Sequence, residues 1–304
     1  MHGLPDIPRC LREALIHWPL SPSPFPQRGK GDFWPLSPSP FPKRGKGSGF
    51  ARYHDWSLRI IQRFLRRPIV TAVNLMTFSK IRHIAFDADD TLWKNEDFYH
   101  ATEMDFGRLL DPFVGSDVAR RALAETESNN MRLLGYGAKA LTISLMETAA
   151  RLVPDHLDAG LVREILAIGT RLLRMPTVLL PDALETVSYA MTRAHVFILT
   201  KGDLLEQERK FDNSPFKAMG LEYVVISGKE PDDYRRQLGL MGIAPSSFLM
   251  VGNSPRSDIR SPLAIGACAA YIPYTITWAH EHVDLEPDPR LIRLDRLGDL
   301  KRYL

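Results

Sequence analysis

The feature that most constrains this chain's fold is an abrupt change from apolar to acidic side chains within residues 81–93. The apolar run 84–86 (Ile-Ala-Phe) is typical of a buried strand in a parallel sheet. Asp87, Asp89 and Asp90 follow this run almost directly. Because open α/β sheets bind ligands beyond the carboxyl ends of their strands, we expect these acids to lie at a functional site.

Two interpretations of this acidic segment follow from the residues alone. Asp87 and Asp89 are two positions apart, so their side chains would point the same way on an extended chain. Like charges this close repel each other unless a cation or a shared proton relieves them, which favours a Mg²⁺ site with a nucleophile. Asp is also common in turns and at helix starts, so the alternative is an acidic turn that caps the next helix.

The segment 87–91 resembles the Asp-x-Asp-x-Thr signature of the haloacid dehalogenase-like (HAD) hydrolases. A second polar segment follows the predicted strand 195–199, where Thr200 and Lys201 precede a Gly and a helix start. A hydroxyl and backbone N–H groups at such a strand end can bind a phosphate oxygen, although Thr200 alone also suits an ordinary helix N-cap. Its position resembles the family's second motif, a Thr or Ser that ends the second strand.

Two further strand ends complete the resemblance. Lys229 precedes a helix start at Pro231, and this position resembles the family's third motif. The alternative is that Lys229 is a solvated surface residue, as a lone Lys usually is. The strand predicted at 247–251 leads into a segment that resembles the fourth motif, Gly-Asp-x-x-x-x-Asp, with Asp258 as its last acid. Asn253 stands where an acid is common. It cannot supply charge, but its carbonyl can ligate a metal or orient a metal-bound water.

The resemblance implies an α/β fold, a Rossmann-like doubly wound parallel sheet (the HAD core) with an inserted all-helical cap domain. We assign residues 76–93 and 177–304 to the core and residues 94–176 to the cap. Apolar side chains at helical spacing support the insertion, and they recur in residues 96–110, 117–134, 139–153 and 158–173. Such an insertion either packs only on its own core or also closes as a lid over the acidic site.

The resemblance also implies a mechanism and a set of site residues. Asp87 would attack the phosphorus of a phosphomonoester to form an aspartyl-phosphate, while Asp89 would protonate the leaving oxygen and then activate water. Mg²⁺ would be held by Asp87, Asp258 and the backbone carbonyl of Asp89. The implied phosphate ligands are Thr200, Lys201 and Lys229, and Asn253 would lie next to the metal. In the cap, the polar candidates for substrate contact are Asn95, Tyr99, Arg132 and Lys139.

Three alternatives to a phosphatase remain. A dehalogenase of the same family is the nearest, but by family analogy it lacks the second acid, because a halide leaving group needs no proton. A phosphomutase would need a cap that retains its substrate, and no such signal is recognised. A non-catalytic binding protein on an HAD core would be expected to lack one of the four motif residues, and none of Asp87, Asp89, Lys229 and Asp258 is missing.

Residues 1–75 differ from the rest of the chain in composition. They hold 12 Lys and Arg against 4 Asp and Glu, and 11 prolines. The segment 18–31 recurs at 34–47 with one difference. Because neither helical nor strand periodicity is present, we expect this extension to be disordered or locally polyproline II. It suits a proline-rich docking arm, a targeting segment, or translated DNA upstream of a start at Met76.

Composition narrows the partners. Residues 76–304 hold 27 Lys and Arg against 32 Asp and Glu, so the basic charge of the chain gives no support to nucleic-acid binding by the core. The sequence contains no run of 18 apolar residues, so no transmembrane helix is predicted. Two cysteines, Cys10 and Cys268, form no disulfide framework and suit the reducing cytoplasm. The resemblance implies a small phosphorylated substrate as the partner, no membrane partner is expected, and the oligomeric state stays open.

Overall fold

A six-stranded parallel sheet forms the centre of the computed structural model, which describes residues 78–275 and 283–304. Its strands are β1 His83–Phe86, β2 His195–Lys201, β3 Glu222–Ile226, β4 Phe248–Gly252, β5 Cys268–Tyr271 and β6 Leu291–Arg293. Their order is β3-β2-β1-β4-β5-β6, and every neighbouring pair is parallel. This order is that of the doubly wound α/β fold, so the fold-class prediction is confirmed. The expectations for residues 1–75, including a start at Met76, lie outside the described residues.

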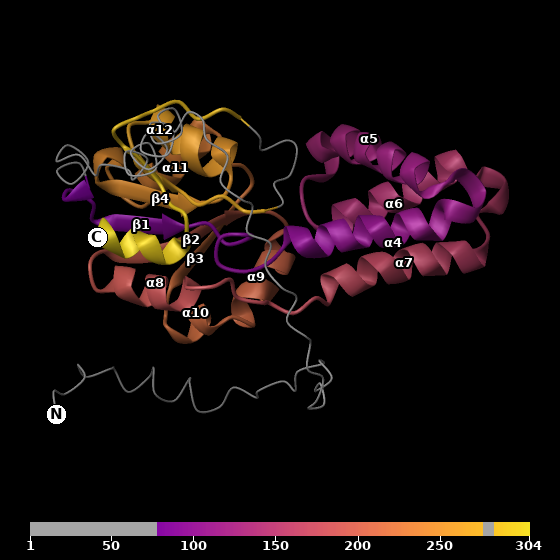
Figure 1. Cartoon of the computed structure of the whole chain (residues 1–304), viewed down its shortest axis with the longest axis horizontal. Coiled ribbons are helices and arrows are strands. Elements are labelled where there is room, and N and C mark those ends of the chain that lie inside the picture. Colours follow the sequence, from indigo (N-terminus) through magenta and orange to yellow (C-terminus); the bar gives the residue numbers. More distant parts are fainter. Residues whose placement is uncertain (1–77, 276–282) are drawn as a thin grey trace, which may run out of the picture.

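Helices cover both faces of the sheet (Figure 1). One face carries α8 Ala183–Met191, α9 Leu204–Asp212, α10 Pro215–Ala218 and the turn η5 Leu297–Arg302. The other carries α11 Pro231–Leu240, the π-helical turn η3 Pro255–Arg260 and α12 Ser261–Ala264, with a short turn η2 Pro245–Ser247 before β4. The sheet is therefore covered on both sides, as an all-parallel sheet requires.

Successive side chains of β1 enter two different hydrophobic cores. Ile84 and Phe86 are fully buried on the face where α8 and η5 pack. Ala85, between them, is fully buried on the opposite face with Tyr234 and Leu238 of α11. Alternate side chains of a strand point to opposite faces, so an unbroken apolar run such as 84–86 is what a sheet covered on both faces needs. The apolar run before the acidic segment follows directly from this burial.

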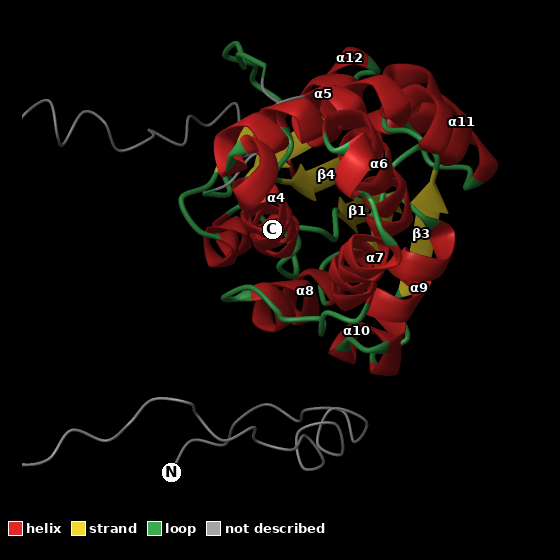
Figure 2. Cartoon of the chain, turned by 90° about the vertical axis from the view of Figure 1, so that its right-hand side faces the viewer, coloured by secondary structure: helices red, strands yellow, loops and turns green. Residues whose placement is uncertain are grey.

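The chain between β1 and β2 forms a helical bundle that lies beside the carboxyl ends of the strands (Figures 1 and 2). It consists of α4 Glu96–Val114, α5 Ser116–Leu134, α6 Ala138–Leu152, the turn η1 Pro154–His156 and α7 Ala159–Leu173. Each of the four segments predicted as helical is a helix. The bundle has a hydrophobic core of its own, to which the four helices contribute the buried side chains of Phe106, Leu123, Leu145 and Ile165, among others.

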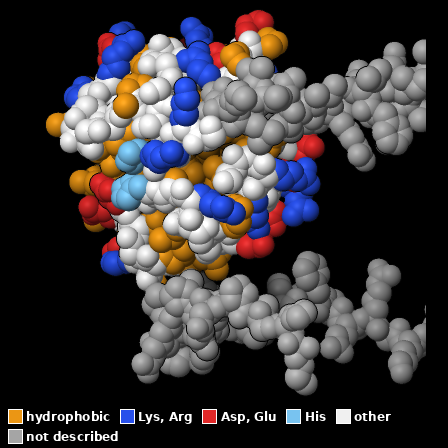
Figure 3. Space-filling model, turned by 90° about the vertical axis from the view of Figure 1, so that its left-hand side faces the viewer, with side chains coloured by type: hydrophobic (Ala, Val, Ile, Leu, Met, Phe, Trp, Pro, Cys, Tyr) orange, Lys and Arg blue, Asp and Glu red, His pale blue; other side chains and the backbone are white. Residues whose placement is uncertain are grey.

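On the surface away from the bundle, the described residues show no concentration of one charge (Figure 3). In the part formed by described residues, Lys and Arg side chains are spread between small apolar areas and scattered acids (Figure 3). Among the helices that the structure describes, none is both long enough and apolar enough to cross a membrane.

Candidate active site

Asp87 stands where the sheet changes direction of winding, directly after β1 and next to β4. β1 lies between β2 and β4 in the sheet. The connections that follow β1 and β4 run to opposite faces of the sheet, and a crevice opens between them at the carboxyl ends of these strands. The backbone N–H of Asp87 donates to the carbonyl of Val251 at 2.8 Å, which fixes the residue to β4. Asp87 is 7% exposed, so its carboxylate faces the crevice with little contact to bulk water.

A buried ammonium joins Asp87 to Asp258. Lys229 Nζ donates to Asp87 Oδ1 at 2.5 Å and to Asp258 Oδ1 at 2.7 Å. Burial and the Asp258 charge raise the pKa of Asp87 to about 7, and the Lys229 ammonium opposes them. Burial alone would lower the pKa of Lys229, but the Asp258 and Asp87 carboxylates raise it, so the amine stays charged. Three residues predicted from separate motifs therefore meet in one buried cluster.

The Thr91 hydroxyl occupies the other side of Asp87. It lies 3.2 Å from Asp87 Oδ2 and 3.1 Å from Asn253 Oδ1, and it accepts the backbone N–H of Asn253 at 3.1 Å. Asp258 is held in turn by the backbone N–H of Ser254, which donates to its Oδ2 at 3.0 Å. Thr91 thus ties the loop after β1 to the loop after β4.

The oxygens gathered here suit a hard divalent cation. The carboxylates of Asp87 and Asp258 and the amide oxygen of Asn253 are the ligand types that Mg²⁺ prefers, and waters usually complete its octahedral shell. The predicted contribution of Asp89 is its backbone carbonyl, which stays a prediction, while its carboxylate binds other partners. Within residues 78–275 and 283–304, no three His, Cys, Asp or Glu side chains are grouped to hold a metal ion.

The Asp89 carboxylate is bound by donors from two segments. Trp93 Nε1 donates to its Oδ1 at 2.7 Å, and Gln207 Nε2 donates to its Oδ2 at 2.7 Å. Lys210 Nζ reaches both oxygens, at 3.0 and 3.1 Å. Gln207 and Lys210 lie on α9, so this helix, and not the metal site, determines where the second acid points.

Asp90 shapes the turn and starts the next helix. Its φ of 59° is in the left-handed region, which Asp tolerates better than most residues. Its carboxylate accepts the backbone N–H of Asn95 at 2.8 Å and that of Glu96 at 3.0 Å, at the beginning of α4. Burial raises the pKa of Asp90 to about 8, and the hydrogen bond from Asn95 opposes this. The capping interpretation of the acidic segment therefore holds for Asp90, whereas Asp87 belongs to the cluster.

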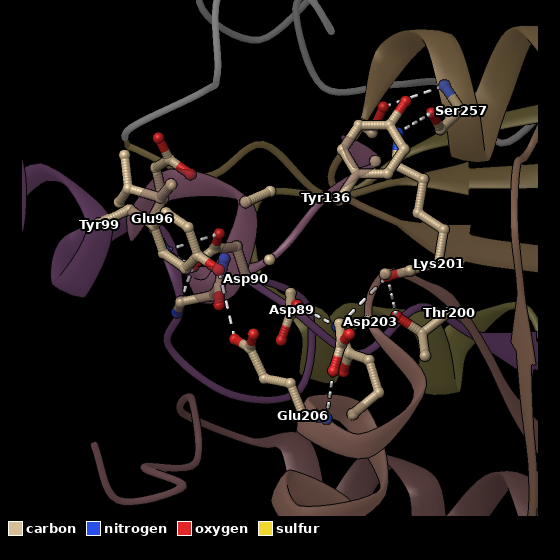
Figure 4. Close-up of a pocket in the computed structure, with 18 of the residues that line it drawn as sticks. Asp89, Asp90, Glu96, Tyr99, Tyr136, Thr200, Lys201, Asp203, Glu206 and Ser257 are labelled. Atoms are coloured by element: carbon tan, nitrogen blue, oxygen red, sulfur yellow. Dashed lines mark hydrogen bonds between the residues drawn. The ribbon is translucent and has the colours of Figure 1, made fainter. Parts of the chain in front are cut away.

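A cavity of about 180 Å³ separates this edge of the sheet from the bundle. Figure 4 shows Asp89 between the labelled bundle residues and Thr200 on the sheet. The bundle contributes carboxylates to the cavity wall, among them Glu96, Glu103 and Glu127. Burial and mutual repulsion raise the pKa of Glu96 and of Glu127 to about 7 each, and burial raises that of Glu103. The wall that the bundle contributes to the cavity thus carries a group of carboxyl side chains.

The predicted phosphate ligands Thr200 and Lys201 line the same cavity. Thr200 is the sixth residue of β2 and is 1% exposed, so it does not cap a helix. Asp203 performs that role, accepting the backbone N–H of Glu206 at 3.0 Å. Lys201 Nζ donates to Ser257 Oγ at 3.0 Å and lies 4.6 Å from the ring centre of Tyr136 in the bundle (Figure 4).

The start of α9 also attaches the bundle to the core. Glu206, 5% exposed, accepts the backbone N–H of Ala138 at 2.8 Å and lies 3.2 Å from the Tyr99 hydroxyl. Asp203 pairs with Lys139 at 2.7 Å. Of the polar bundle residues singled out in the sequence, Tyr99 and Asn95 line the cavity, Lys139 makes this ion pair, and Arg132 is exposed.

Sequence reasoning did not identify the residues of α9 that face the site. Glu206, Gln207 and Lys210 share one side of the helix, and the first two are buried. The available signal was that Gln207 and Lys210 follow Glu206 by one and by four residues, which puts all three on one side of a helix that begins directly after the Thr200 segment. A polar helix face usually meets solvent, so this spacing alone does not distinguish a site from a surface.

The chain is similar to known hydrolases in sequence and in fold. The family model for haloacid dehalogenase-like hydrolases matches residues 81–266. A solved haloacid dehalogenase-like hydrolase from Xanthomonas campestris is 33% identical, with 73% of this chain and 90% of that chain covered and a TM-score of 0.66. No curated protein matches the sequence.

More distant structures share the fold. A protein from Burkholderia xenovorans LB400 described as a haloacid dehalogenase-like hydrolase is 16% identical, covering 73% of this chain and 95% of that one, with a TM-score of 0.52. A defluorinating L-2-haloacid dehalogenase is 15% identical, covering 74% of this chain and 95% of that one, with a TM-score of 0.50. At this identity the likeness is one of fold alone.

Proposed function

Because this chain belongs to the haloacid dehalogenase-like hydrolases, we propose that it hydrolyses small phosphomonoesters, with Asp87 as the nucleophile. The observation that carries the proposal is the second carboxylate, Asp89, two residues after Asp87 in the wall of the same cavity. An alkoxide leaving from phosphorus needs a proton, whereas a halide leaving from carbon does not. An acid in this position therefore favours a phosphate substrate over a haloacid.

The reaction has two steps. Asp87 attacks phosphorus and the bond to the leaving oxygen breaks, while Asp89 gives that oxygen its proton. Water then attacks the phosphorus of the aspartyl-phosphate, Asp89 takes a proton from the water, and Asp87 is restored as phosphate leaves. Dividing one difficult displacement in this way is the purpose of a covalent nucleophile.

The cations of the site stabilise the phosphoryl oxygens. Lys229 already contacts Asp87, so its charge lies beside the group that Asp87 would receive. Thr200 and Lys201 supply a hydroxyl and a second ammonium from the end of β2. Asp87, Asp258 and the backbone carbonyl of Asp89 would hold Mg²⁺, with Asn253 beside it, and the ion when bound would neutralise phosphoryl charge and orient the reacting oxygens.

We infer that the helical bundle is the cap of this enzyme. It closes the cavity from the side opposite the sheet, and its contacts to α9 hold it there. A cavity of about 180 Å³ suits a metabolite of a few heavy atoms beyond the phosphate and not a polymer. Exclusion of water by such a cap protects the aspartyl-phosphate from side reactions.

The test compares the two chemistries of the family on the full chain. p-Nitrophenyl phosphate and 2-chloropropanoate are supplied separately with Mg²⁺, and phosphate and chloride release are measured. We expect phosphate release that Asp87→Asn abolishes and Asp155→Asn, an exposed control on η1, preserves. Chloride release without phosphate release would assign the dehalogenase reaction instead. A screen of phosphorylated metabolites then identifies the substrate.

A further inference from the structure

Lys210 occupies a position that an ordinary helix-surface lysine does not. Its side chain is only 14% exposed, although it lies on α9, whose sequence is mostly polar. Its ammonium has three acceptor residues, Asp89 at 3.0 Å, Asn95 at 2.8 Å and Glu206 at 3.4 Å. An ammonium has three N–H donors, so these neighbours can satisfy it completely.

The ammonium of Lys210 stays protonated in this position. Burial by itself would lower the pKa of Lys210, but the carboxylates of Asp89 and Glu206 raise it. Glu206 is in turn fixed by Tyr99 and by the backbone N–H of Ala138 in the bundle. The ammonium is therefore held between the core loop that carries Asp89 and a carboxylate that is attached to the bundle.

We propose that Lys210 is a positioning residue that sets the orientation of Asp89 for proton transfer in the proposed phosphatase reaction. The inference rests on that proposed function. Proton transfer requires the donor oxygen to lie within hydrogen-bond reach of the leaving oxygen, and small displacements of a catalytic group cost large factors in rate. Lys210 binds both oxygens of Asp89, so it can release one towards the substrate and keep hold of the other.

The competing explanation is that Lys210 only stabilises the fold. Trp93 and Gln207 also bind Asp89, so the carboxylate would keep two partners without Lys210. A purely structural lysine would affect every substrate by the same factor. A lysine that acts through Asp89 would affect the substrates that need the proton, and only while Asp89 is present.

The experiment is a double-mutant cycle on the full chain with two substrates that differ in leaving group. Phenyl phosphate has a basic leaving oxygen and needs the proton, whereas p-nitrophenyl phosphate needs it much less. The variants are Lys210→Met, Asp89→Asn and their combination. Lys217→Met is the matched control, because Lys217 is exposed on α10 and pairs only with the exposed Asp212 among its described contacts.

We expect Lys210→Met to lower kcat for phenyl phosphate by about tenfold or more and that for p-nitrophenyl phosphate by about threefold or less, with KM little changed. In the Asp89→Asn background the same substitution should change either rate by less than about twofold. Lys210→Arg, which keeps the charge, should restore part of the phenyl phosphate rate. It also serves as the readout if the Met variant does not fold.

Two results would overturn the inference, and they are distinguishable. Equal losses for the two substrates, or an undiminished loss in the Asp89→Asn background, would make Lys210 structural while the phosphatase function stands. No turnover of either ester by the wild-type chain, under conditions in which it is folded, would remove the proposed function and this inference with it.

Discussion

The carboxylate of Asp258 lies directly against the backbone of Gly252. A Cβ atom added at position 252 would meet Asp258 Cγ at 2.4 Å and Asp258 Cβ at 2.6 Å, closer than Cβ atoms approach other atoms. Gly252 ends β4, and Asp258 bonds to Lys229 and to the N–H of Ser254. The absence of a side chain at one residue therefore determines where the acid of the cluster can stand.

Replacing Gly252 by Ala should displace Asp258 from Lys229. We expect Gly252→Ala to lower phosphatase kcat/KM by at least about tenfold through the loss of this geometry, and stability by about 1–3 kcal/mol through overpacking. Gly239→Ala is the control, because a Cβ there meets nothing within 4 Å on α11. That change should leave turnover unaltered and raise stability by about 0.5–1 kcal/mol. If the Gly252→Ala variant turns over substrate as fast as the wild-type chain, the position of Asp258 beside Lys229 is not needed for catalysis.

Asp89→Asn should act selectively on substrates with poor leaving groups. The amide cannot deliver a proton, so alkyl phosphates should lose about 10²-fold or more in kcat while p-nitrophenyl phosphate loses less. Steady-state kinetics on a series of esters measure this as a steeper dependence of rate on leaving-group basicity. If the loss is the same across the series, Asp89 is not the acid.

Removal of divalent cations should abolish turnover. Chelation leaves Asp87 and Asp258 with Lys229 alone to balance their charge, and Mg²⁺ or Mn²⁺ should restore the rate. Ca²⁺ should bind and inhibit, because its larger and looser shell misplaces the nucleophile. Dialysed protein assayed with each cation provides the measurement, and full activity in excess chelator would contradict the oxygen-ligand site.

The carboxyl groups that the bundle contributes to the cavity wall should make stability depend on pH. The pKa of Glu127 is raised from 4.5 to about 7, by burial first and then by Glu103. A carboxyl with a higher pKa in the folded state binds its proton more tightly there, so its contribution to stability is greatest below pH 4.5. That contribution is lost as the pH rises through about 7.

Glu127→Gln should therefore raise the melting temperature at pH 8 and leave it unchanged near pH 4.5. The gain at pH 8 corresponds to at most about 3 kcal/mol, reduced by solvent screening of a partly exposed group. Glu164→Gln, an exposed change on α7, is the control and should shift neither value. Thermal unfolding followed by circular dichroism at both pH values gives the comparison, and equal shifts at both would rule out the raised pKa as the cause.

The sequence by itself was sufficient for most of the regular elements and for the order of the motifs. Buried strands such as β1 and amphipathic helices such as α5 are encoded by local periodicity, because each needs an apolar face of a particular spacing. The resemblance of the segments after β1, β3 and β4 to the family's motifs predicted the meeting of Asp87, Lys229 and Asp258, since parallel strands bring their carboxyl ends to one edge. The three-residue β6 escaped prediction, because so short a segment has no period to detect.

Only the tertiary structure decided how the polar residues around that cluster are used. Asp89 and Asp90 look alike in the sequence, yet one binds α9 and the other caps α4. Lys210 and Lys217 are both lysines close together in the chain, yet one is buried against Asp89 and the other is exposed. Local spacing specifies which side of a helix is polar. Whether that side meets water or a carboxylate depends on the element it packs against, and that contact is made by residues more than a hundred positions away.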